Sequence, residues 1–169
     1  RLVPVGHAGN QSESPEEAVV VAALVTAALD GGTWTDDAGA EHALGLADIL
    51  VVAPYNAQVK AIAERLPAGA RVGTVDKFQG QQAPIVVYSM ATSSPEEAPR
   101  GMQFLYSPNR LNVATSRAKC LAVVVASPSL FAPECRTPEQ MRLANAFCRF
   151  AELSDGFDAA EITTVQQLQ

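Results

Sequence analysis

Three apolar runs limit what this chain can fold into more than any other feature of its sequence. They cover residues 48–53, 85–90 and 120–126, and a shorter strand-like run covers residues 71–74. Continuous apolar runs of this length are typical of strands that are buried on both faces of a parallel sheet. Because helix-length segments separate these runs, the sequence predicts an α/β sandwich with a mainly parallel sheet.

Two segments carry the signal that starts a helix. Ser14 is predicted to cap a helix that begins at Pro15, and Glu17 stands where a capping box needs its acidic partner. Residues 137–140 repeat this pattern with Thr, Pro, Glu and Gln. The two glycines at 31 and 32 are predicted to end the first helix. The segment 33–46 is predicted to be a surface loop, because it holds several Gly and Asp residues.

The charge of the chain is acidic overall but unevenly spread. A net charge of -6 argues against a protein that binds nucleic acid with its whole surface. No acidic residue lies between Ala98 and Pro133, so this segment forms a local basic strip. The strip contains Arg100, Arg110, Arg117 and Lys119.

The length of 169 residues fits one domain, which we expect over residues 1–153, with residues 154–169 as a tail or linker. The chain begins with Arg1 and not with Met, which favours a piece of a larger protein. No apolar run approaches the ~20 residues that a membrane span needs, so no membrane partner is expected.

The cysteines and histidines give no sign of a metal site. The 3 cysteines lack metal-ligand spacing and favour a reduced, cytoplasmic protein over a disulfide scaffold. Cys120 is predicted to be a small core residue. His7 and His42 are predicted to be loop residues, because neither has a cysteine or carboxylate partner at ligand spacing.

The first polar cluster, Pro54-Tyr55-Asn56, follows an apolar run directly. Ligands of parallel α/β sheets gather at the carboxyl ends of the strands, which is where this cluster should lie. Backbone amides at the start of the next helix could hold a phosphate, and Tyr55 could stack on a nucleic-acid base. The alternative is an ordinary strand-to-helix turn in which Asn56 only caps the helix.

The second cluster, residues 73–82, places two glycines, a threonine, an acid, a lysine and three glutamines between two strands. Glutamine and threonine side chains bond phosphate or sugar oxygens, and Gly80 allows a close backbone approach. The alternative is a connecting loop in which Asp76 caps and Phe78 anchors the loop by burial.

The third cluster, residues 109–119, holds three cations and two amides directly before the last apolar run. Basic residues at that point lie at the rim of a sheet, where the planar fork of an arginine can bind two phosphate oxygens. Arg117 would act as an arginine finger toward a γ-phosphoryl group, with Arg110 assisting it or fixing the helix. The alternative is a solvated helix face with scattered charge.

The usual apparatus for gripping a nucleoside triphosphate is missing from the sequence. The chain contains no Gly-x-x-x-x-Gly-Lys-Ser/Thr phosphate loop. No apolar run ends in a paired Asp-Glu that would hold Mg²⁺. A nucleotide at the basic cluster would therefore need a second protein element to hold it.

In this order the three clusters resemble motifs IV, V and VI of superfamily 1 helicases. The matching segments are 49–58, 72–82 and 110–119, and the resemblance extends from about His7 to Leu153. The branch that the chain resembles includes the nonsense-mediated-decay helicases and bacterial helicase–nuclease relatives. The resemblance implies a RecA-like, P-loop NTPase-type three-layer sandwich that lacks its own Walker A loop.

The resemblance also implies a role as the second motor domain of an ATP-dependent helicase or translocase. In that family ATP binds between two RecA-like domains, and the first domain carries the phosphate loop and the acid that holds Mg²⁺. The second domain would supply Arg117 as the catalytic arginine finger, and this chain alone is expected to be inactive. ATP contacts are expected from Gly80, Gln82, Arg110 and Arg117.

The remaining partner implied by the resemblance is single-stranded DNA or RNA. Residues expected to contact or organise its backbone are Pro54, Tyr55, Asn56, Thr74 and Asp76. Two departures stand out: many relatives have Glu where this chain has Gln82, and no arginine lies at residues 11–15, near the first helix. The acidity of the chain and the missing phosphate loop favour an alternative, a non-catalytic RecA-like module that binds nucleic acid or a protein.

Overall fold

The computed structural model describes residues 1–78 and 80–154, so the predicted tail lies outside the described residues except for Ser154. Its centre is a 5-stranded sheet in the order β1-β7-β6-β4-β5, and every neighbouring pair is parallel. The strands are β1 (Leu2–Pro4), β4 (Ile49–Ala53), β5 (Arg71–Thr74), β6 (Ala83–Ser89) and β7 (Ala118–Ala126). The predicted parallel sheet is therefore confirmed.

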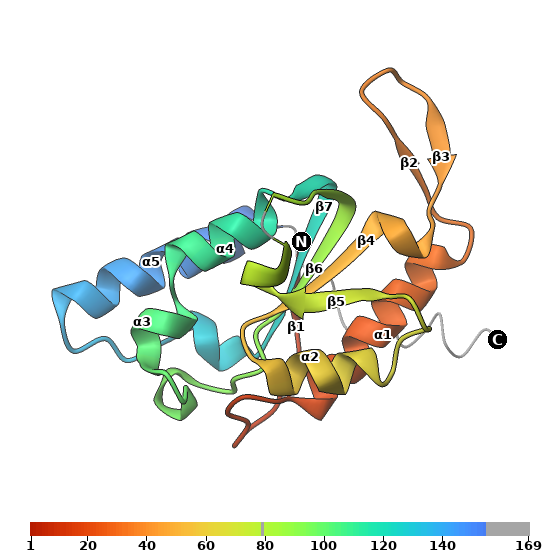
Figure 1. Ribbon diagram of the computed structural model, residues 1–169. Coiled ribbons are helices and arrows are strands. Elements are labelled where there is room, and N and C mark those ends of the chain that lie inside the picture. Colours follow the sequence, from red (N-terminus) through yellow and green to blue (C-terminus); the bar gives the residue numbers. More distant parts are fainter. Residues whose placement is uncertain (79, 155–169) are drawn as a thin grey trace.

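Helices cover both faces of this sheet (Figure 1). One face carries α1 (Pro15–Leu29) and α2 (Asn56–Ala63), and the other carries α3 (Gly101–Leu105), α4 (Pro108–Thr115) and α5 (Pro138–Leu153). Short 3₁₀ turns connect the elements: η1 (Leu46–Asp48), η2 (Val75–Phe78), η3 (Pro95–Glu97) and η4 (Pro128–Phe131). Within the described ranges, no helix has the length and hydropathy that crossing a membrane requires.

The central strands are mostly apolar because their side chains enter two separate cores. In β4, Leu50 and Val52 pack with α3, α4 and α5, whereas Ile49 and Val51 pack with α1 and α2. Successive side chains of a strand point to opposite faces of the sheet, so covering both faces leaves no position for polar alternation. This confirms the expected three-layer α/β/α sandwich.

The segment 33–46, predicted to be a loop, instead forms a hairpin that stands away from the body (Figure 1). Its strands are β2 (Thr33–Thr35) and β3 (Glu41–Ala43). The rings of Trp34 and His42 stack at 4.9 Å, and the Asp36 carboxylate lies 2.8 Å from His42 Nε2. The His42 hydrogen bond lowers the pKa of the Asp36 carboxyl. These contacts join residues across the turn, which the hydrophobic pattern does not record.

The prediction that Cys120 is a core residue is wrong, because Cys120 is exposed. Strand β1 pairs with β7 only from Val124 to Ala126, so the first half of β7 has no strand on that side among the described residues. Burial follows the pairing: only Val123–Ala126 of this strand is fully buried. The apolar run 120–126 therefore begins before the part of β7 that neighbouring elements bury.

Candidate functional site

The parallel sheet has two rims, and the predicted site residues divide between them. Residues 54–56 follow the carboxyl end of β4, and Thr74 is the last residue of β5. In contrast, residues 80–82 come directly before β6, and Arg117 comes directly before β7. Because Ala83 pairs with Ala118, these two segments lie side by side at the amino rim of the sheet.

This division corrects the expectation that the polar clusters all gather at the carboxyl ends of the strands. The second cluster reaches both rims, because the chain must return along the sheet to connect the parallel strands β5 and β6. Turn η2 makes part of this return (Figure 1). Lys77 Nζ donates to the Val72 carbonyl at 2.8 Å, and Phe78 is buried against the core. Anchoring by Phe78 is thus confirmed.

Arg117 is held at the amino rim by backbone and side-chain hydrogen bonds. Its carbonyl accepts from the Ala83 amide at 3.1 Å, and its Nη1 donates to the Gln81 carbonyl at 3.1 Å. Its Nε is buried and has no hydrogen-bond partner among the described residues. The guanidinium therefore lies beside the segment that contains Gly80 and Gln82.

The rim around Arg117 fits a phosphate oxygen better than a metal ion. A buried N–H without an acceptor costs about 1–3 kcal/mol, and an anionic oxygen would offset this penalty at Arg117 once the side chain turns toward solvent. Gly80 is exposed with φ +78°, and no atom lies within 4 Å of the position where a side chain would begin. Gln82 is exposed as well. Within residues 1–78 and 80–154, no three His, Cys, Asp or Glu side chains come together as a metal site.

Arg110, predicted to act with Arg117, lies toward the other rim. It occupies the first turn of α4, whereas Arg117 follows the end of that helix, on the order of 10 Å further along its axis. The Arg110 guanidinium carbon is 4.1 Å from the centre of the Phe104 ring. Burial raises the pKa of the Tyr55 hydroxyl, and the charge of Arg110 is among the effects that oppose this shift. The structure does not bring Arg110 and Arg117 together.

The residues at the carboxyl rim differ in how far they face solvent. Pro54 and Tyr55 are buried, and the Tyr55 ring lies 5.5 Å from that of Phe104. Asn56 and Asp76 are exposed, and Thr74 is half-buried. The capping alternative for Asn56 is wrong, because Tyr55 holds the N-cap position and helix α2 already includes Asn56. Asn56 therefore keeps its amide for other partners.

Comparison with known proteins assigns the fold to a family. The AAA domain family matches residues 6–129. The chain belongs to this family. The chain is 27% identical over 137 residues to the DNA replication ATP-dependent helicase/nuclease JHS1 of Arabidopsis thaliana, a match that covers 80% of this chain and 9% of the relative. It is 39% identical over 82 residues to the DNA polymerase alpha-associated DNA helicase A of Schizosaccharomyces pombe, which covers 47% of this chain and 12% of that protein.

A third relative belongs to the branch expected from the motifs. It is the regulator of nonsense transcripts 1 homolog of Neurospora crassa, 33% identical over 94 residues, with 50% of this chain and 8% of the relative covered. This AAA domain is thus a superfamily 1 helicase-like domain, and the expected resemblance to superfamily 1 helicases is confirmed at that level. The match spans only 8% to 12% of the length of these three relatives.

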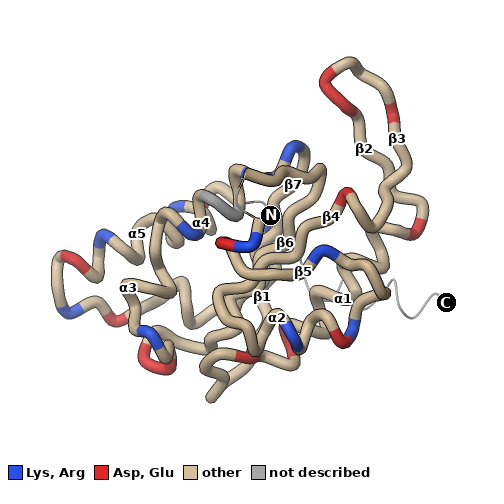
Figure 2. The backbone as a smooth tube through the Cα atoms, viewed as in Figure 1, with Lys and Arg blue, Asp and Glu red and all other residues tan. Residues whose placement is uncertain are grey.

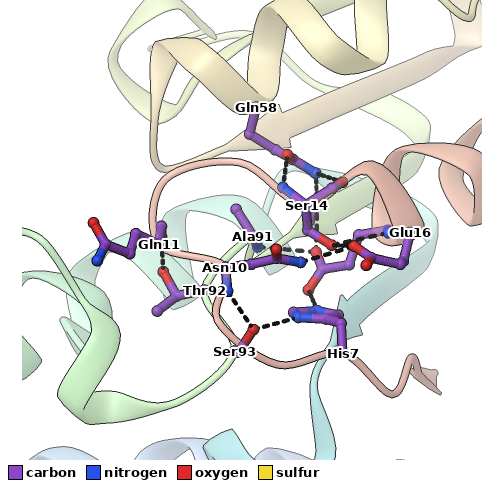
Figure 3. A network of polar contacts seen from close by, with 11 residues as sticks. His7, Asn10, Gln11, Ser14, Glu16, Gln58, Ala91, Thr92 and Ser93 are labelled. Atoms are coloured by element: carbon purple, nitrogen blue, oxygen red, sulfur yellow. Dashed lines mark hydrogen bonds and ion pairs between the residues drawn. The ribbon is translucent and has the colours of Figure 1, made fainter.

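The AAA domain also contains a buried polar network that sequence reasoning missed (Figure 3). Its centre is the Glu17 carboxylate, which is fully buried. One carboxylate oxygen lies 3.0 Å from His7 Nε2, and the other accepts from Ser89 Oγ at 2.6 Å and from the Ala91 amide at 2.9 Å. His7 Nδ1 lies 2.7 Å from Ser93 Oγ. His7 lies in a loop, as predicted, but it is not isolated, because its buried side chain is a partner of Glu17.

The network replaces half of the capping box predicted at the start of α1. Ser14 Oγ accepts from the Glu17 amide at 3.1 Å, as predicted. The Ser14 amide, however, donates to Gln58 Oε1 at 2.7 Å and not to Glu17. Gln58 Nε2 also donates to Ser89 Oγ at 2.8 Å, which ties α2 to the end of β6. The network thus joins the loop before α1, helix α2 and the loop after β6 at the carboxyl rim of the AAA domain.

One sequence signal could have revealed the role of Glu17. The buried positions of α1 are Glu17, Ala18, Val21 and Val25, which share one helix face. A carboxylate on an apolar helix face must find hydrogen-bond donors inside the protein, because burying an unpaired charge is costly. Ala91, whose amide is one of those donors, has φ +66°, a backbone conformation that alanine rarely adopts. Glu17 therefore also holds a strained turn in place.

Gly73 allows η2 to fold back over β5, and its substitution tests this packing. An added Cβ would lie 2.4 Å from Lys77 Cδ and 3.0 Å from Phe78 Cε2. We expect Gly73→Ala to lower the free energy of unfolding by about 1–3 kcal/mol, because the side chains of η2 must shift. Urea denaturation measures the change. Gly6→Ala is the matched control, since no atom lies within 4 Å of its added Cβ; equal losses in the two variants would contradict the packing role.

Proposed function

We propose that this AAA domain is the second motor domain of an ATP-dependent superfamily 1 helicase or translocase that moves on single-stranded nucleic acid. One observation carries the proposal: Arg117 lies at the amino rim beside the Gly80–Gln82 segment, and its buried Nε has no acceptor among the described residues. Once its side chain turns toward solvent, a guanidinium at this rim suits a phosphate presented from outside the chain. The motor domain would comprise residues 1–153.

On the nucleotide side, Arg117 is the catalytic residue and the Gly80 backbone and Gln82 side chain line the same rim. When bound, ATP with Mg²⁺ supplies the hydrolysable γ-phosphoryl group. Arg117 places a fixed positive charge where negative charge develops in the transition state. Gln82 is exposed and offers an amide for hydrogen bonding without the charge of a glutamate. The phosphate loop and the Mg²⁺ ligands would come from an N-terminal RecA-like domain of the same protein.

On the nucleic-acid side, the exposed groups lie at the opposite rim of the sheet. Asn56 and Thr74 are suited to hydrogen bonds with phosphate or sugar oxygens. Asp76 is an acceptor when ionised, so it would bond a sugar hydroxyl or a base amino group and not a phosphate. Pro54 and Tyr55 are buried behind these groups and would shape the surface. Such contacts are largely independent of base sequence.

ATP hydrolysis and its dependence on single strands test the proposal. The chain alone should not hydrolyse ATP, because its sequence contains no phosphate loop. A protein that joins it to a phosphate-loop motor domain should hydrolyse ATP faster when oligothymidylate or oligouridylate is added. A phosphate-release assay measures both rates. The proposal would be contradicted if the chain alone hydrolysed ATP. It would also be contradicted if the hydrolysis rate of the joined protein stayed the same when single strands were added.

A non-catalytic module is the second candidate, and the missing phosphate loop and the net charge of -6 favour it for the chain taken alone. The same assay separates the two functions. A joined protein that binds single strands or a protein partner without any ATP hydrolysis would support the module. In that case Arg117 would be a structural residue at the rim of the sheet.

A further inference from the structure

Two arginines stack on one phenylalanine ring near the carboxyl rim of the sheet. The guanidinium carbons of Arg100 and Arg110 lie 3.9 Å and 4.1 Å from the centre of the Phe104 ring. Arg100 directly precedes α3, Phe104 belongs to α3, and Arg110 lies in the first turn of α4. The Phe104 ring in turn packs against Tyr55. Three separate elements therefore meet at this ring.

The two guanidiniums keep their hydrogen-bond donors free. Among the described residues, neither side chain forms an ion pair or donates a hydrogen bond. Other arginines of the domain do: Arg71 donates to the Ala47 carbonyl, and Arg149 pairs with Glu152. Stacking on a ring uses the flat face of a guanidinium and leaves its N–H edges available. Arg100 is exposed and Arg110 is half-buried, so solvent reaches the cluster.

We propose that Arg100, Phe104 and Arg110 form a binding site for the backbone phosphates of single-stranded nucleic acid, here named the stacked-arginine site. The inference rests on the proposed function and extends its nucleic-acid surface. Unpaired guanidiniums present donors in the fork geometry that matches phosphate oxygens. The ring orients both groups before binding, which lowers the entropy cost of ordering them on the ligand.

The position of the site favours a nucleic-acid phosphate over that of a free nucleotide. Phe104 contacts Tyr55, which follows the carboxyl end of β4, whereas Arg117 lies at the amino rim. Arg110, which the resemblance placed among the ATP contacts, is therefore assigned to the nucleic-acid surface. Glu96 and Glu97 precede Arg100 in the chain, and Figure 2 shows acidic and basic residues side by side next to α3, but neither glutamate forms an ion pair with Arg100. The negative charges of these glutamates repel the nucleic-acid backbone, so the loss of either stacked arginine should weaken binding strongly.

Fluorescence anisotropy with labelled oligothymidylate and oligouridylate tests the stacked-arginine site on the 169-residue chain. The variants are Arg100→Gln, Arg110→Gln and the double variant, with Arg142→Gln as the matched control. Arg142 is exposed on α5 and makes no ion pair with another described residue, so its substitution removes the same charge elsewhere. We expect the double variant to bind about tenfold more weakly than the control. The salt slope, which is the slope of the logarithm of the binding constant against the logarithm of the salt concentration, should be smaller by about 1.4, because two phosphate contacts are lost.

A third variant separates charge from stacking. Phe104→Leu keeps both arginines and removes the ring, so we expect weaker binding with a salt slope close to that of the unaltered chain. Thermal melting verifies that each variant is folded. If Arg110→Gln disturbs α4, the exposed Arg100→Gln variant still decides the question, because it should bind more weakly and lower the slope by about 0.7.

The outcomes distinguish this site from the proposed function. Variants that bind like the Arg142→Gln control would overturn the stacked-arginine site, while binding by the unaltered chain would still support the motor domain. An unaltered chain that binds neither oligonucleotide would overturn the site together with the proposed nucleic-acid surface. In a protein that joins the chain to a phosphate-loop motor domain, variants that lose affinity for labelled ATP, but not for oligonucleotides, would assign these arginines to the free nucleotide and reject the site.

Discussion

Replacing Arg117 with alanine is expected to abolish ATP turnover in a protein that joins this AAA domain to a phosphate-loop domain. An arginine finger contributes roughly 10³–10⁵ in rate, and alanine cannot place a charge at the γ-phosphoryl group. ATP binding should survive, because the phosphate loop of the partner domain supplies most of its contacts. Single-turnover hydrolysis and binding of a labelled nucleotide measure the two effects separately. A rate loss below about tenfold would reject the assignment.

Arg71 provides the matched control for this experiment. It also lies near the amino rim, and its guanidinium bonds the Ala47 carbonyl and Gln81 Oε1 at 2.6 Å and 2.8 Å. Arg71→Ala removes the same charge from the same region, but the donors it removes already have protein acceptors. We expect it to change turnover far less than Arg117→Ala. Equal losses would mean that the charge of the rim matters and that no single guanidinium is aimed at the nucleotide.

Replacing Glu17 with alanine is expected to lower the free energy of unfolding by about 3 kcal/mol or more. The change leaves His7, Ser89 and the Ala91 amide without their acceptor inside the protein, and each buried unsatisfied group costs about 1–3 kcal/mol. The strained turn at Ala91 also loses the carboxylate that holds it. Chemical denaturation measures the loss, and Glu17→Gln, which keeps the shape, should lose less.

Glu16 is the neighbouring control for Glu17. Its carboxylate accepts from Asn10 Nδ2 and Ser14 Oγ, but the residue is exposed and water can replace both donors. We expect Glu16→Ala to cost less than about 1 kcal/mol. If the two variants lost the same stability, Glu17 would act as an ordinary helix-start residue, and the network at the carboxyl rim would not stabilise the fold.

Local patterns in the sequence were sufficient to predict the layers of the fold and the family to which the chain belongs. The continuous apolar run at 49–53 needs cover on both faces, because neither face of such a strand tolerates water. The Thr137 capping box depends on residues within one helical turn, and the structure contains it complete with Gln140. The residues around Gly80 form one continuous segment of the chain, and those around Arg117 form another. The resemblance of each segment to a helicase motif was therefore visible in the sequence.

The tertiary structure alone decided which rim of the sheet each residue occupies. Arg110 and Arg117 are seven positions apart, yet helix α4 carries them toward opposite rims because it runs antiparallel to the strand that follows it. Glu17 meets Ser89 across 72 positions of sequence. Contacts of such separation depend on the parallel register of the strands and on side-chain packing. A one-dimensional pattern of residue types records neither.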